Sequence, residues 1–254
     1  MQDAADLVRF YDEAYSHDAD SGALYARWRA LGAVGKADHV IELCRRERIS
    51  PRSTLEIGCG DGALLSELSR RGFGGSLQGV EITQGAVDIA SRRPELASVE
   101  LYDGLHLSEA DGAIDLGILS HVLEHVPDPA VLLAEAARAC RAVVVEVPLE
   151  ANWSARRAGK REHAAEVGHL QRLDRDAMRT IVTRAGMRVA CEVEDPLPRH
   201  AQVFFARGRS ARALGTCKWA VRAALHRLVP GLARRLFTVH YLSLIHISEP
   251  TRPY

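Results

Sequence analysis

The stretch LEIGCGDG, Leu55 to Gly62, decides the fold, because a short apolar run passes into three glycines at alternate positions. The apolar run is typical of a buried strand, and the glycines let the backbone turn tightly and approach a ligand closely. The segment that follows, ALLSELSRRG, has leucines at helical spacing and is closed by Gly72. We therefore predict a strand, a ligand-binding turn and a helix, in that order.

Strand-like and helical segments alternate after this turn. The runs SLQGVEI, SVELYD, AIDLGILS and AVVVEVP read as strands, and QGAVDIASRR and PAVLLAEAARAC read as helices. Strands separated by helices indicate an α/β fold, a Rossmann-like doubly wound sheet that is mostly parallel. The last two strand-like runs, MRVACEVED and HAQVFFAR, are joined by a short Pro-rich connection and are predicted to pair as an antiparallel hairpin at the sheet edge.

The chain divides into four segments by pattern. Residues 1–50 are predicted to form a helical N-terminal cap, residues 51–208 the ligand-binding domain, and residues 209–241 a basic helical appendage. The terminal LSLIHISEPTR resembles a translated sequencing adapter, so we exclude residues 242–254 from the fold and expect the natural chain to be cut near Tyr241.

Composition narrows the class of protein. With 47% hydrophobic and 26% charged residues among 254, the chain has the make-up of a soluble globular protein. No stretch approaches the roughly 18 apolar residues of a spanning helix, and the N-terminus lacks the apolar region of a signal peptide, which indicates a cytoplasmic location. The five cysteines form no C-x-x-C pair, so neither a disulfide framework nor a thiolate zinc site is indicated.

Charge is unevenly distributed along the chain. The net charge is formally zero, but residues 196–248 contain no Asp or Glu and nine Lys or Arg. Within this basic tail an apolar stripe falls at helical spacing, formed by Leu214, Cys217, Val221, Leu225 and Leu228. The stripe would suit contact of residues 209–241 with the surface of an anionic membrane. Alternatively, this helix covers the acidic body of its own chain or packs against a second subunit. The protein is expected to be a monomer or a homodimer. Nucleic-acid binding is not expected, because the tail lacks interleaved aromatics and the body is acidic.

A second motif, SHVLEHVPDP, places His121, Glu124 and His125 in the H-x-x-E-H pattern of inverted zinc peptidases. That chemistry needs a continuous helix, which would bring both imidazoles to one face. Pro127 and Pro129 leave no room for such a helix, so we expect no metal centre of this kind. Glu124 and His125 are instead expected to cap and brace the start of the next helix, and His121 to orient a substrate hydroxyl.

The glycine turn and the strand after it indicate the ligand. Glu81 ends the next strand-like run nineteen residues after Gly62, a position from which a carboxylate binds ribose hydroxyls. The turn is G-x-G-x-G, whereas dinucleotide sites use G-x-G-x-x-G with a helix N-terminus facing a pyrophosphate. Glu56 and Asp61 would repel a diphosphate but suit a positively charged ligand such as a sulfonium nucleoside. A nicotinamide-dependent oxidoreductase is therefore the disfavoured alternative.

Four motifs together resemble the class I S-adenosylmethionine-dependent methyltransferases, especially the small-molecule branch of ubiquinone-pathway and related type 11 and type 12 enzymes. LEIGCGDG matches their first motif, GVEI the second, LYDG the third and ILSHVLEHVPDP the fourth. The resemblance covers roughly residues 50–208 in the right order. It implies a seven-stranded sheet with strand order 3-2-1-4-5-7-6, in which HAQVFFAR is the counterpart of the antiparallel seventh strand.

The resemblance also implies a donor site for S-adenosylmethionine, with S-adenosylhomocysteine as product. Glu56 and the glycine turn would hold the methionine moiety, Glu81 the ribose hydroxyls, and Asp103 the adenine amino group. The full set of expected donor-binding residues is Lys36, Glu56, Gly58, Cys59, Gly60, Gly62, Glu81, Ile82, Asp103, Gly104, Leu105, Ser120 and His121.

The acceptor is less well indicated than the donor. A sulfonium is already an excellent leaving group, so methyl transfer is an in-line displacement for which the protein mainly aligns the reactants. The candidate catalytic residues are His121, His125 and His169, the last in the loop Ala151–Leu173 that is placed to touch a substrate. A small-molecule or lipid-like acceptor is expected, and the remaining alternative is a donor-binding scaffold without catalysis.

Overall fold

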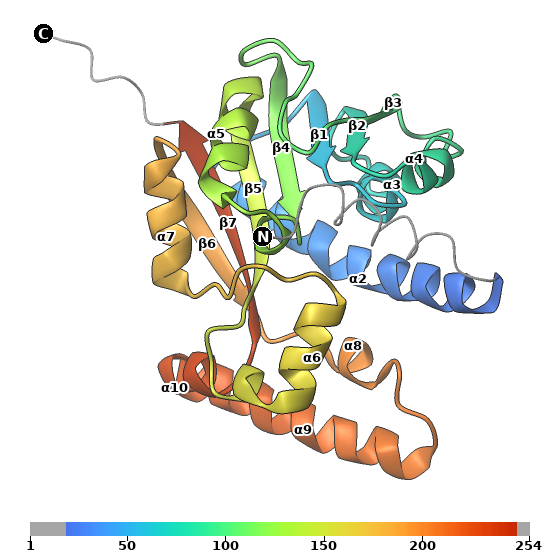
Figure 1. Cartoon of the computed structure of the whole chain (residues 1–254), viewed down its shortest axis with the longest axis vertical. Helices are drawn as coiled ribbons and strands as arrows, with labels where there is room; N and C mark the ends of the chain where they lie inside the picture. Colours follow the sequence, from blue (N-terminus) through green and yellow to red (C-terminus); the bar gives the residue numbers. More distant parts are fainter. Residues whose placement is uncertain (1–18, 248–254) are drawn as a thin grey trace, which may run out of the picture.

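The computed structural model describes residues 19–247, which form a seven-stranded sheet covered by helices on both faces (Figure 1). The strand order is β3-β2-β1-β4-β5-β7-β6, which confirms the predicted fold class and strand order. Neighbours from β3 to β5 run parallel, and β7 runs antiparallel to both β5 and β6. The strands are β1 (Ser53–Ile57), β2 (Ser76–Glu81), β3 (Ser98–Leu101), β4 (Ile114–Ser120), β5 (Cys140–Leu149), β6 (Met187–Asp195) and β7 (Val239–Ile247).

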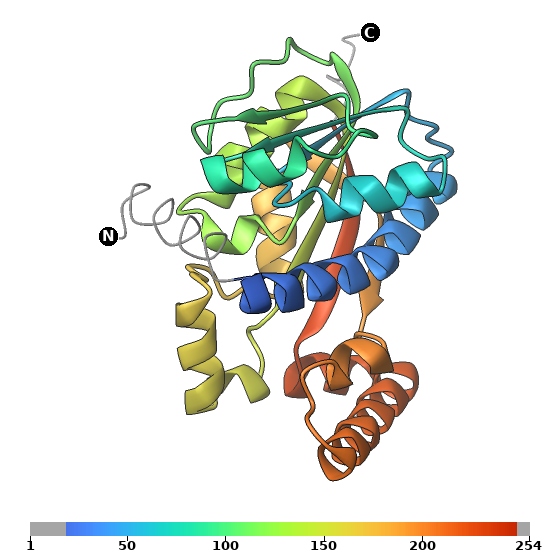
Figure 2. The same ribbon diagram turned by 90° about the vertical axis from the view of Figure 1, so that its right-hand side faces the viewer.

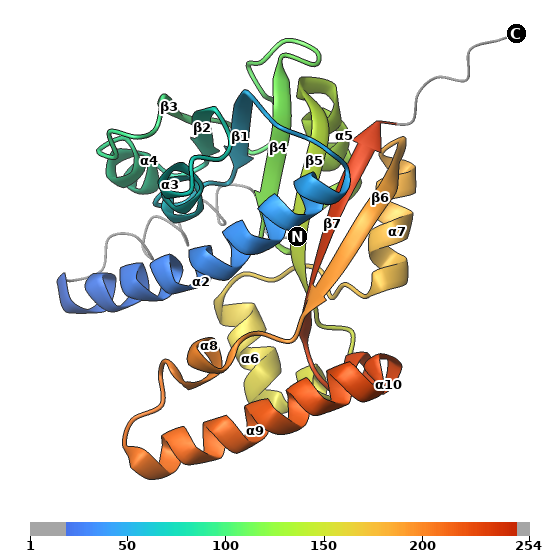
Figure 3. The same cartoon turned by 180° about the vertical axis from the view of Figure 1, so that it is seen from behind.

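The helices cover the two faces of this sheet and its carboxyl edge. The N-terminal helical segment is the long helix α2, which packs behind the sheet, while α5 and α7 cover the opposite face (Figures 1 and 3). The helices are α2 (Ala19–Arg46), α3 (Ala63–Arg70), α4 (Gln84–Ala90), η1 (Leu123–His125), α5 (Pro129–Ala139), η2 (Ser154–Arg156), α6 (Ala158–Glu166), α7 (Arg175–Arg184), α8 (Arg199–Val203), α9 (Arg209–Leu228) and α10 (Pro230–Leu236).

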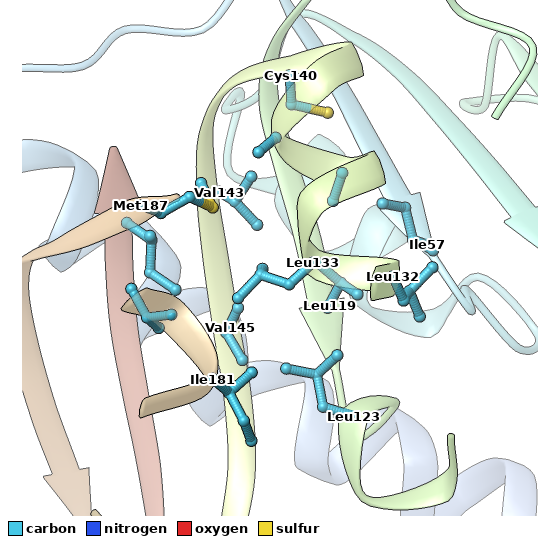
Figure 4. Packing of buried hydrophobic residues seen from close by; sticks show 14 of the residues in the cluster. Ile57, Leu119, Leu123, Leu132, Leu133, Cys140, Val143, Val145, Ile181 and Met187 are labelled. Atoms are coloured by element: carbon cyan, nitrogen blue, oxygen red, sulfur yellow. The ribbon is translucent and has the colours of Figure 1, made fainter. Parts of the chain in front are cut away.

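Strand β5 shows why the sheet needs cover on both sides. Its side chains alternate between faces, as the two-residue period of a strand requires. Val143 and Val145 join the core beneath α5 and α7, where Leu133 meets them (Figure 4). Ala142 and Val144 join the core beneath α2 and α3. All four β5 side chains are at most 3% exposed. The middle of the sheet is therefore apolar on both faces, and polar residues at the strand ends are exceptions.

The segment HAQVFFAR is not a strand, and that expectation is wrong. Its first part lies in the short helix α8, which begins directly after Pro198. Phe204 and Phe205 follow, and their rings lie 5.2 and 5.1 Å from the ring of Trp28 on α2. Aromatic packing against α2 therefore takes these side chains away from the sheet edge.

The seventh strand is β7, which comes from the end of the chain. It pairs with β5 from Ala142 to Leu149 and with β6 from Met187 to Asp195. A strand between two others is buried on both faces, and every residue from 241 to 245 is buried. Residues 242–247, which we had excluded from the fold, therefore form most of this strand; residues 248–254 lie outside the described residues. The division into domains stays a prediction, but the sheet takes its last strand from beyond residue 208.

The segment between β6 and β7 lies beyond the carboxyl edge of the sheet. Figure 2 shows α8, α9 and α10 grouped at one end of the molecule. No residue of α9 is buried, and Leu214, Val221 and Leu228 are 57, 56 and 77% exposed. Among the helices that the structure describes, none is long and apolar enough to cross a membrane.

Candidate active site

Buried polar residues gather at the carboxyl ends of neighbouring strands. Glu56 lies on β1, Glu81 ends β2, Ser120 ends β4 and Glu146 lies near the end of β5. All four are less than 9% exposed. In doubly wound sheets the ligand crevice lies outside these strand ends. Buried carboxylates on an otherwise apolar platform therefore mark the candidate site.

The glycine turn after β1 depends on its glycines. Gly58, Gly60 and Gly62 have φ angles of 74, 54 and 73°, in the left-handed region that side chains disfavour. A Cβ at Gly58 would lie 2.6 Å from Cγ2 of Val122, which follows β4. The backbone at Gly58 is thus pressed against the segment after β4. Between these glycines Cys59 buries its side chain, so this residue offers a ligand only its backbone.

The carboxylate of Glu81 ties the end of β2 to the glycine turn. Gly60 N–H donates to Oε2 at 2.9 Å, and Ile82 N–H donates to Oε1 at 2.7 Å. Burial raises the pKa of Glu81, and these backbone donors oppose that shift. A Cβ at Gly104 would lie 3.4 Å from Cγ2 of Ile82, so the two residues form adjacent walls at the strand end. Binding of a nucleoside at this strand end stays a prediction.

Asp103 organises the loop after β3. Its Oδ1 accepts hydrogen bonds from Leu105 N–H at 2.8 Å and His106 N–H at 2.7 Å, and Nδ1 of His106 lies 2.6 Å from its Oδ2. The hydrogen bond to the His106 ring lowers the pKa of Asp103 to about 2. The side chain of Leu105 is 36% exposed. Asp103 and Leu105 therefore form an open rim beside Gly104, with the carboxylate ionised.

Glu56 has a carboxylate oxygen that nothing satisfies. The residue is 4% exposed, and Oε2 has no hydrogen-bond partner among residues 19–247. Burial raises the pKa of Glu56 to about 8; Lys36 opposes the shift, whereas nearby carboxylates, Asp61 first among them, support it. Buried polar atoms almost always have partners in folded proteins. A positively charged ligand group is the partner that this oxygen would accept most readily.

Lys36 reaches the site from α2. Its Nζ donates to Ser120 Oγ at 2.9 Å and lies 3.9 Å from Oε2 of Glu146, and Ser120 Oγ donates to the same carboxylate oxygen at 2.7 Å. Lys36 therefore balances a buried carboxylate of the protein. About two turns earlier on α2, Nε of Arg29 lies 2.7 Å from Oδ2 of Asp61. Helix α2 thus supplies the cations that hold the acidic turn in place.

His121 lies directly after β4, between two buried carboxylates. Its Nδ1 lies 2.9 Å from Oε1 of Glu124, and its Nε2 lies 3.6 Å from Oε1 of Glu146. Burial and Lys36 oppose protonation of this ring, but the two carboxylates outweigh them and raise its pKa to about 9. Its φ of 60° is unusual for a residue with a side chain, and such strain is concentrated at functional sites. His121 is therefore a hydrogen-bond donor at neutral pH.

Glu124 and His125 do not cap a helix, so that expectation is wrong. They lie in the single 3₁₀ turn η1, and α5 begins only at Pro129. The cap of α5 is Asp128, whose carboxylate accepts a hydrogen bond from Ala130 N–H at 3.1 Å. Proline fixes the first helical position of α5, which leaves the preceding H-x-x-E-H residues outside it. The continuous helix of a zinc peptidase is replaced by a strand end and a tight turn.

The turn η1 instead holds the loop that follows β5. The backbone oxygen of Glu124 accepts hydrogen bonds from Leu170 N–H at 2.8 Å and Gln171 N–H at 3.0 Å. This brings His169 beside His125, with ring centroids 4.8 Å apart. The structure thus brings together two of the three candidate catalytic histidines, and His121 joins them through its contact with Glu124.

Three further residues of the site were missed in the sequence. Glu146 is a single acid in the apolar run AVVVEVP, a signal that could have been used. Glu150 follows β5, and its Oε2 lies 2.8 Å from Nδ1 of His169. His240 comes from β7, and its Nδ1 lies 3.1 Å from Oε1 of Glu146. Since β7 was assigned elsewhere, no sequence signal placed His240 at the site.

Comparison with known proteins agrees with this geometry. A methyltransferase-domain family model matches residues 25–192. The chain belongs to this methyltransferase family. The family recognised from the four motifs is thereby confirmed.

Relatives of this methyltransferase include ubiquinone biosynthesis O-methyltransferases. The protein from Thiobacillus denitrificans is 28% identical over 151 residues, which cover 54% of the chain and 58% of the relative. The protein from Albidiferax ferrireducens is 27% identical over 154 residues, covering 56% of the chain and 54% of the relative. The chain therefore spans little more than half the length of these curated relatives.

Solved structures share the fold at low sequence identity. A geranyl diphosphate C-methyltransferase from Streptomyces coelicolor A3(2), in complex with Mg²⁺, geranyl diphosphate and S-adenosyl-L-homocysteine, has a TM-score of 0.58 at 14% identity and covers 77% of this chain and 72% of its own. A phosphoethanolamine N-methyltransferase from Haemonchus contortus, in complex with S-adenosylhomocysteine, has a TM-score of 0.61 at 11% identity and covers 96% of this chain and 60% of its own. At these identities the likeness shows the fold alone.

Proposed function

We propose that this methyltransferase uses S-adenosylmethionine to methylate an oxygen, nitrogen or carbon atom of a small-molecule or lipid-like acceptor. The observation that carries the proposal is that Oε2 of Glu56, beside the glycine turn, has no hydrogen-bond partner among the described residues. A sulfonium donor brings positive charge to this position, and a neutral or diphosphate ligand does not. The family match supports the same donor.

The donor extends along the strand ends in the order of the motifs. Its methionine moiety lies over the glycine turn and Glu56, and its ribose hydroxyls donate to Glu81. Its adenine packs on Ile82 beside Asp103, and Gly104 and Leu105 line its rim. Lys36, Ser120 and His121 form the floor beneath the methyl group, where Lys36 keeps Glu146 neutralised. S-adenosylhomocysteine leaves as the product, without the sulfonium charge.

The acceptor approaches from the side of η1 and the loop after β5. Protonated His121 donates to the acceptor or to its neighbouring polar group and thereby orients it, while His125 and His169 activate the acceptor atom. Alignment of the nucleophile with the methyl carbon and sulfur supplies most of the acceleration, because the leaving group needs no assistance. His169 is the member of the pair that the segment after β5 contributes.

Calorimetric titration with S-adenosylmethionine tests the donor site. We expect saturable binding by the wild-type chain and binding about 10 to 100 times weaker in Glu81→Ala, which loses charge-assisted hydrogen bonds to ribose. Glu42→Ala is the matched control, since Glu42 pairs with Arg45 and Arg46 at the surface of α2, away from the strand ends. A folded wild-type chain without donor binding would reject the proposal. Turnover of labelled donor with pooled metabolites separates an enzyme from a donor-binding scaffold.

We also propose that α9 rests on an anionic membrane, which suits a lipid-like acceptor. Leu214, Val221 and Leu228 are spaced by seven residues, so they line one face of α9, and all three are more than half exposed. Helix α9 has no acidic residue, so pairing with α9 of a second copy would bring like charges together. Anionic lipid offers both the apolar layer and the opposite charge. The cytoplasmic location stays a prediction.

Vesicle sedimentation tests this surface. The wild-type chain should sediment with phosphatidylglycerol-containing vesicles and not with pure phosphatidylcholine, and Val221→Glu should abolish the difference. Val131→Glu is the matched control, since Val131 is 48% exposed on α5 at another face. Equal sedimentation of Val221→Glu and wild type would reject the membrane contact. It would also be rejected if the wild type dimerised with rising concentration and Val221→Glu, unlike the control, did not.

A further inference from the structure

A second buried carboxylate oxygen lacks a partner, on the acceptor side of the site. Glu124 is 1% exposed, and its Oε1 is bonded by His121 at 2.9 Å. Its Oε2 has no hydrogen-bond partner in the part of the chain that the structure describes. A folded protein rarely leaves such an oxygen unsatisfied, so the oxygen indicates a missing ligand.

Two histidines lie close to the carboxylate of Glu124. Glu124, His125 and His169 each offer one ligand atom, and these atoms all lie within 4.8 Å of one another. The rings of His125 and His169 meet edge to face at an interplanar angle of 74°. Two imidazoles and one carboxylate form a set of ligands that zinc and iron ions use in proteins.

The outer contacts of the two histidines are those of metal ligands. Nδ1 of His169 lies 2.8 Å from Oε2 of Glu150, and Nδ1 of His125 lies 3.1 Å from the backbone oxygen of Gly168. A histidine that binds a metal usually donates its other ring nitrogen to a carboxylate or a backbone carbonyl, which fixes the tautomer and the direction of the ring. In both residues this arrangement turns Nε2 to the opposite side of the ring.

The neighbouring cluster around Glu146 lacks these features. His121, Glu146 and His240 also bring three ligand atoms together. However, both oxygens of Glu146 already have partners, because His240 lies 3.1 Å from Oε1 and Ser120 donates to Oε2 at 2.7 Å. Lys36 also lies 3.9 Å from this carboxylate and would repel a cation. Only the Glu124 cluster combines histidines with an unsatisfied acidic oxygen.

We propose that Glu124, His125 and His169 bind a divalent transition-metal ion of the zinc type, with Glu150 as a positioning residue. The ion draws the three ligand atoms closer and keeps at least one position for the acceptor. His169 is 13% exposed at its side chain, so this position is reached from the acceptor loop. Three protein ligands with an open position are typical of catalytic rather than structural zinc sites.

The inference deepens the proposed function and rests on it, because it names the acceptor atom as a hydroxyl oxygen. The oxygen becomes a ligand of the ion, which lowers the pKa of its O–H group, and the proton passes to water. An oxygen lone pair then forms the new C–O bond, while the electron pair of the breaking C–S bond returns to sulfur. No oxidant, reductant or further reactant is needed.

Titration of the metal-free, untagged full chain with Co²⁺ tests the site by a readout separate from activity. We expect one Co²⁺ per chain with the intense visible absorption of a low-coordinate ion. Glu124→Gln and His169→Gln should each bind Co²⁺ at least about 100 times more weakly, since each removes a ligand. Glu47→Gln is the matched control, because Glu47 also lies beside a histidine, 3.9 Å from His246.

Two results would overturn the metal site. One is Co²⁺ binding by Glu124→Gln with the affinity and spectrum of the wild type; the other is a wild-type chain that binds S-adenosylmethionine but no Co²⁺. If Glu124→Gln fails to fold, Glu150→Gln decides instead, with an expected weakening of about 10 to 100 times, and unchanged affinity there would equally overturn the site. Absence of donor binding would count against the proposed function, so the two failures are distinguishable.

Discussion

Replacing Glu56 by glutamine should remove a pH-dependent loss of stability from the donor-free protein. The carboxyl group is fully buried at the end of β1, and burial raises its pKa from 4.5 to about 8. In the unfolded chain the group titrates near its ordinary value. Between these two pKa values the folded state therefore holds a proton that the unfolded state has released. Stability from this group is present below pH 4.5 and falls as the pH rises toward 8.

The size of the effect follows from the two pKa values. Each pH unit inside this window costs up to about 1.4 kcal/mol, and the slope flattens as the pH approaches the folded pKa. With pKa values of 4.5 and about 8, the free energy of unfolding should fall by about 2 kcal/mol between pH 6 and pH 8 from this residue alone. Glutamine has the same shape and no charge to desolvate, so Glu56→Gln should lose that slope.

Urea unfolding of both proteins at pH 6, 7 and 8 measures this difference. Comparison of the two curves cancels all other titrating groups, including the histidines of the site, as far as they titrate alike in the two proteins. Glu67→Gln is the control, because Glu67 is ion-paired with Arg70 and Arg71 and Arg70 lowers its pKa. If Glu56→Gln and wild type lose stability in parallel from pH 6 to pH 8, the buried carboxyl is ionised throughout and the argument for a neutral Glu56 is refuted.

Three further predictions follow from the same contacts. Donor binding at pH 7 should release about one proton from Glu56, visible as a binding enthalpy that varies with the ionisation enthalpy of the buffer; a buffer-independent enthalpy would contradict it. Gly58→Ala should lower the free energy of unfolding, measured in urea, by about 2–4 kcal/mol, because φ is 74° and the new Cβ would lie 2.6 Å from Val122. Adding Val122→Ala to this variant should restore part of the lost stability. Lys36→Met should cost about 3 kcal/mol, because it removes the ammonium group beside the buried carboxylate of Glu146 and leaves His121 to balance that charge. Exposed Lys218→Met should cost almost nothing, and equal urea midpoints for Lys36→Met and wild type would show that Lys36 does not balance Glu146.

The five parallel strands of the sheet and the position of the donor-side residues at their ends were predictable because their signals are local. The run LEIGCGDG contains both the strand and the turn, and Glu81 ends its strand within the same continuous stretch. Each of these residues is placed by its own strand end, and parallel strands bring their carboxyl ends to one edge. The expected roles of Glu56 and Glu81 therefore needed no knowledge of distant contacts.

The acceptor side was not predictable in the same way, since its residues meet through long-range contacts. The helices α8, α9 and α10 separate β6 from β7, so nothing near His240 in the sequence shows that it returns beside Glu146. The capping expectation for Glu124 failed because Asp128 lies closer to the start of α5. Residues whose partners lie on another element need the register of the sheet before their role can be argued.

The two sites inferred here share one physical cause. Glu56 on the donor side and Glu124 on the acceptor side are both buried carboxylates with one oxygen left unsatisfied. His121 and Glu124 both follow β4, the strand beside β1 on which Glu56 lies, and His121 contacts Glu124. A scaffold that only bound the donor would need the free oxygen of Glu56. In such a scaffold the free oxygen of Glu124 would lower the stability of the fold without serving a function. An enzyme that transfers a methyl group from a cationic donor to a metal-bound hydroxyl needs both, so the second unsatisfied oxygen favours catalysis over simple donor binding.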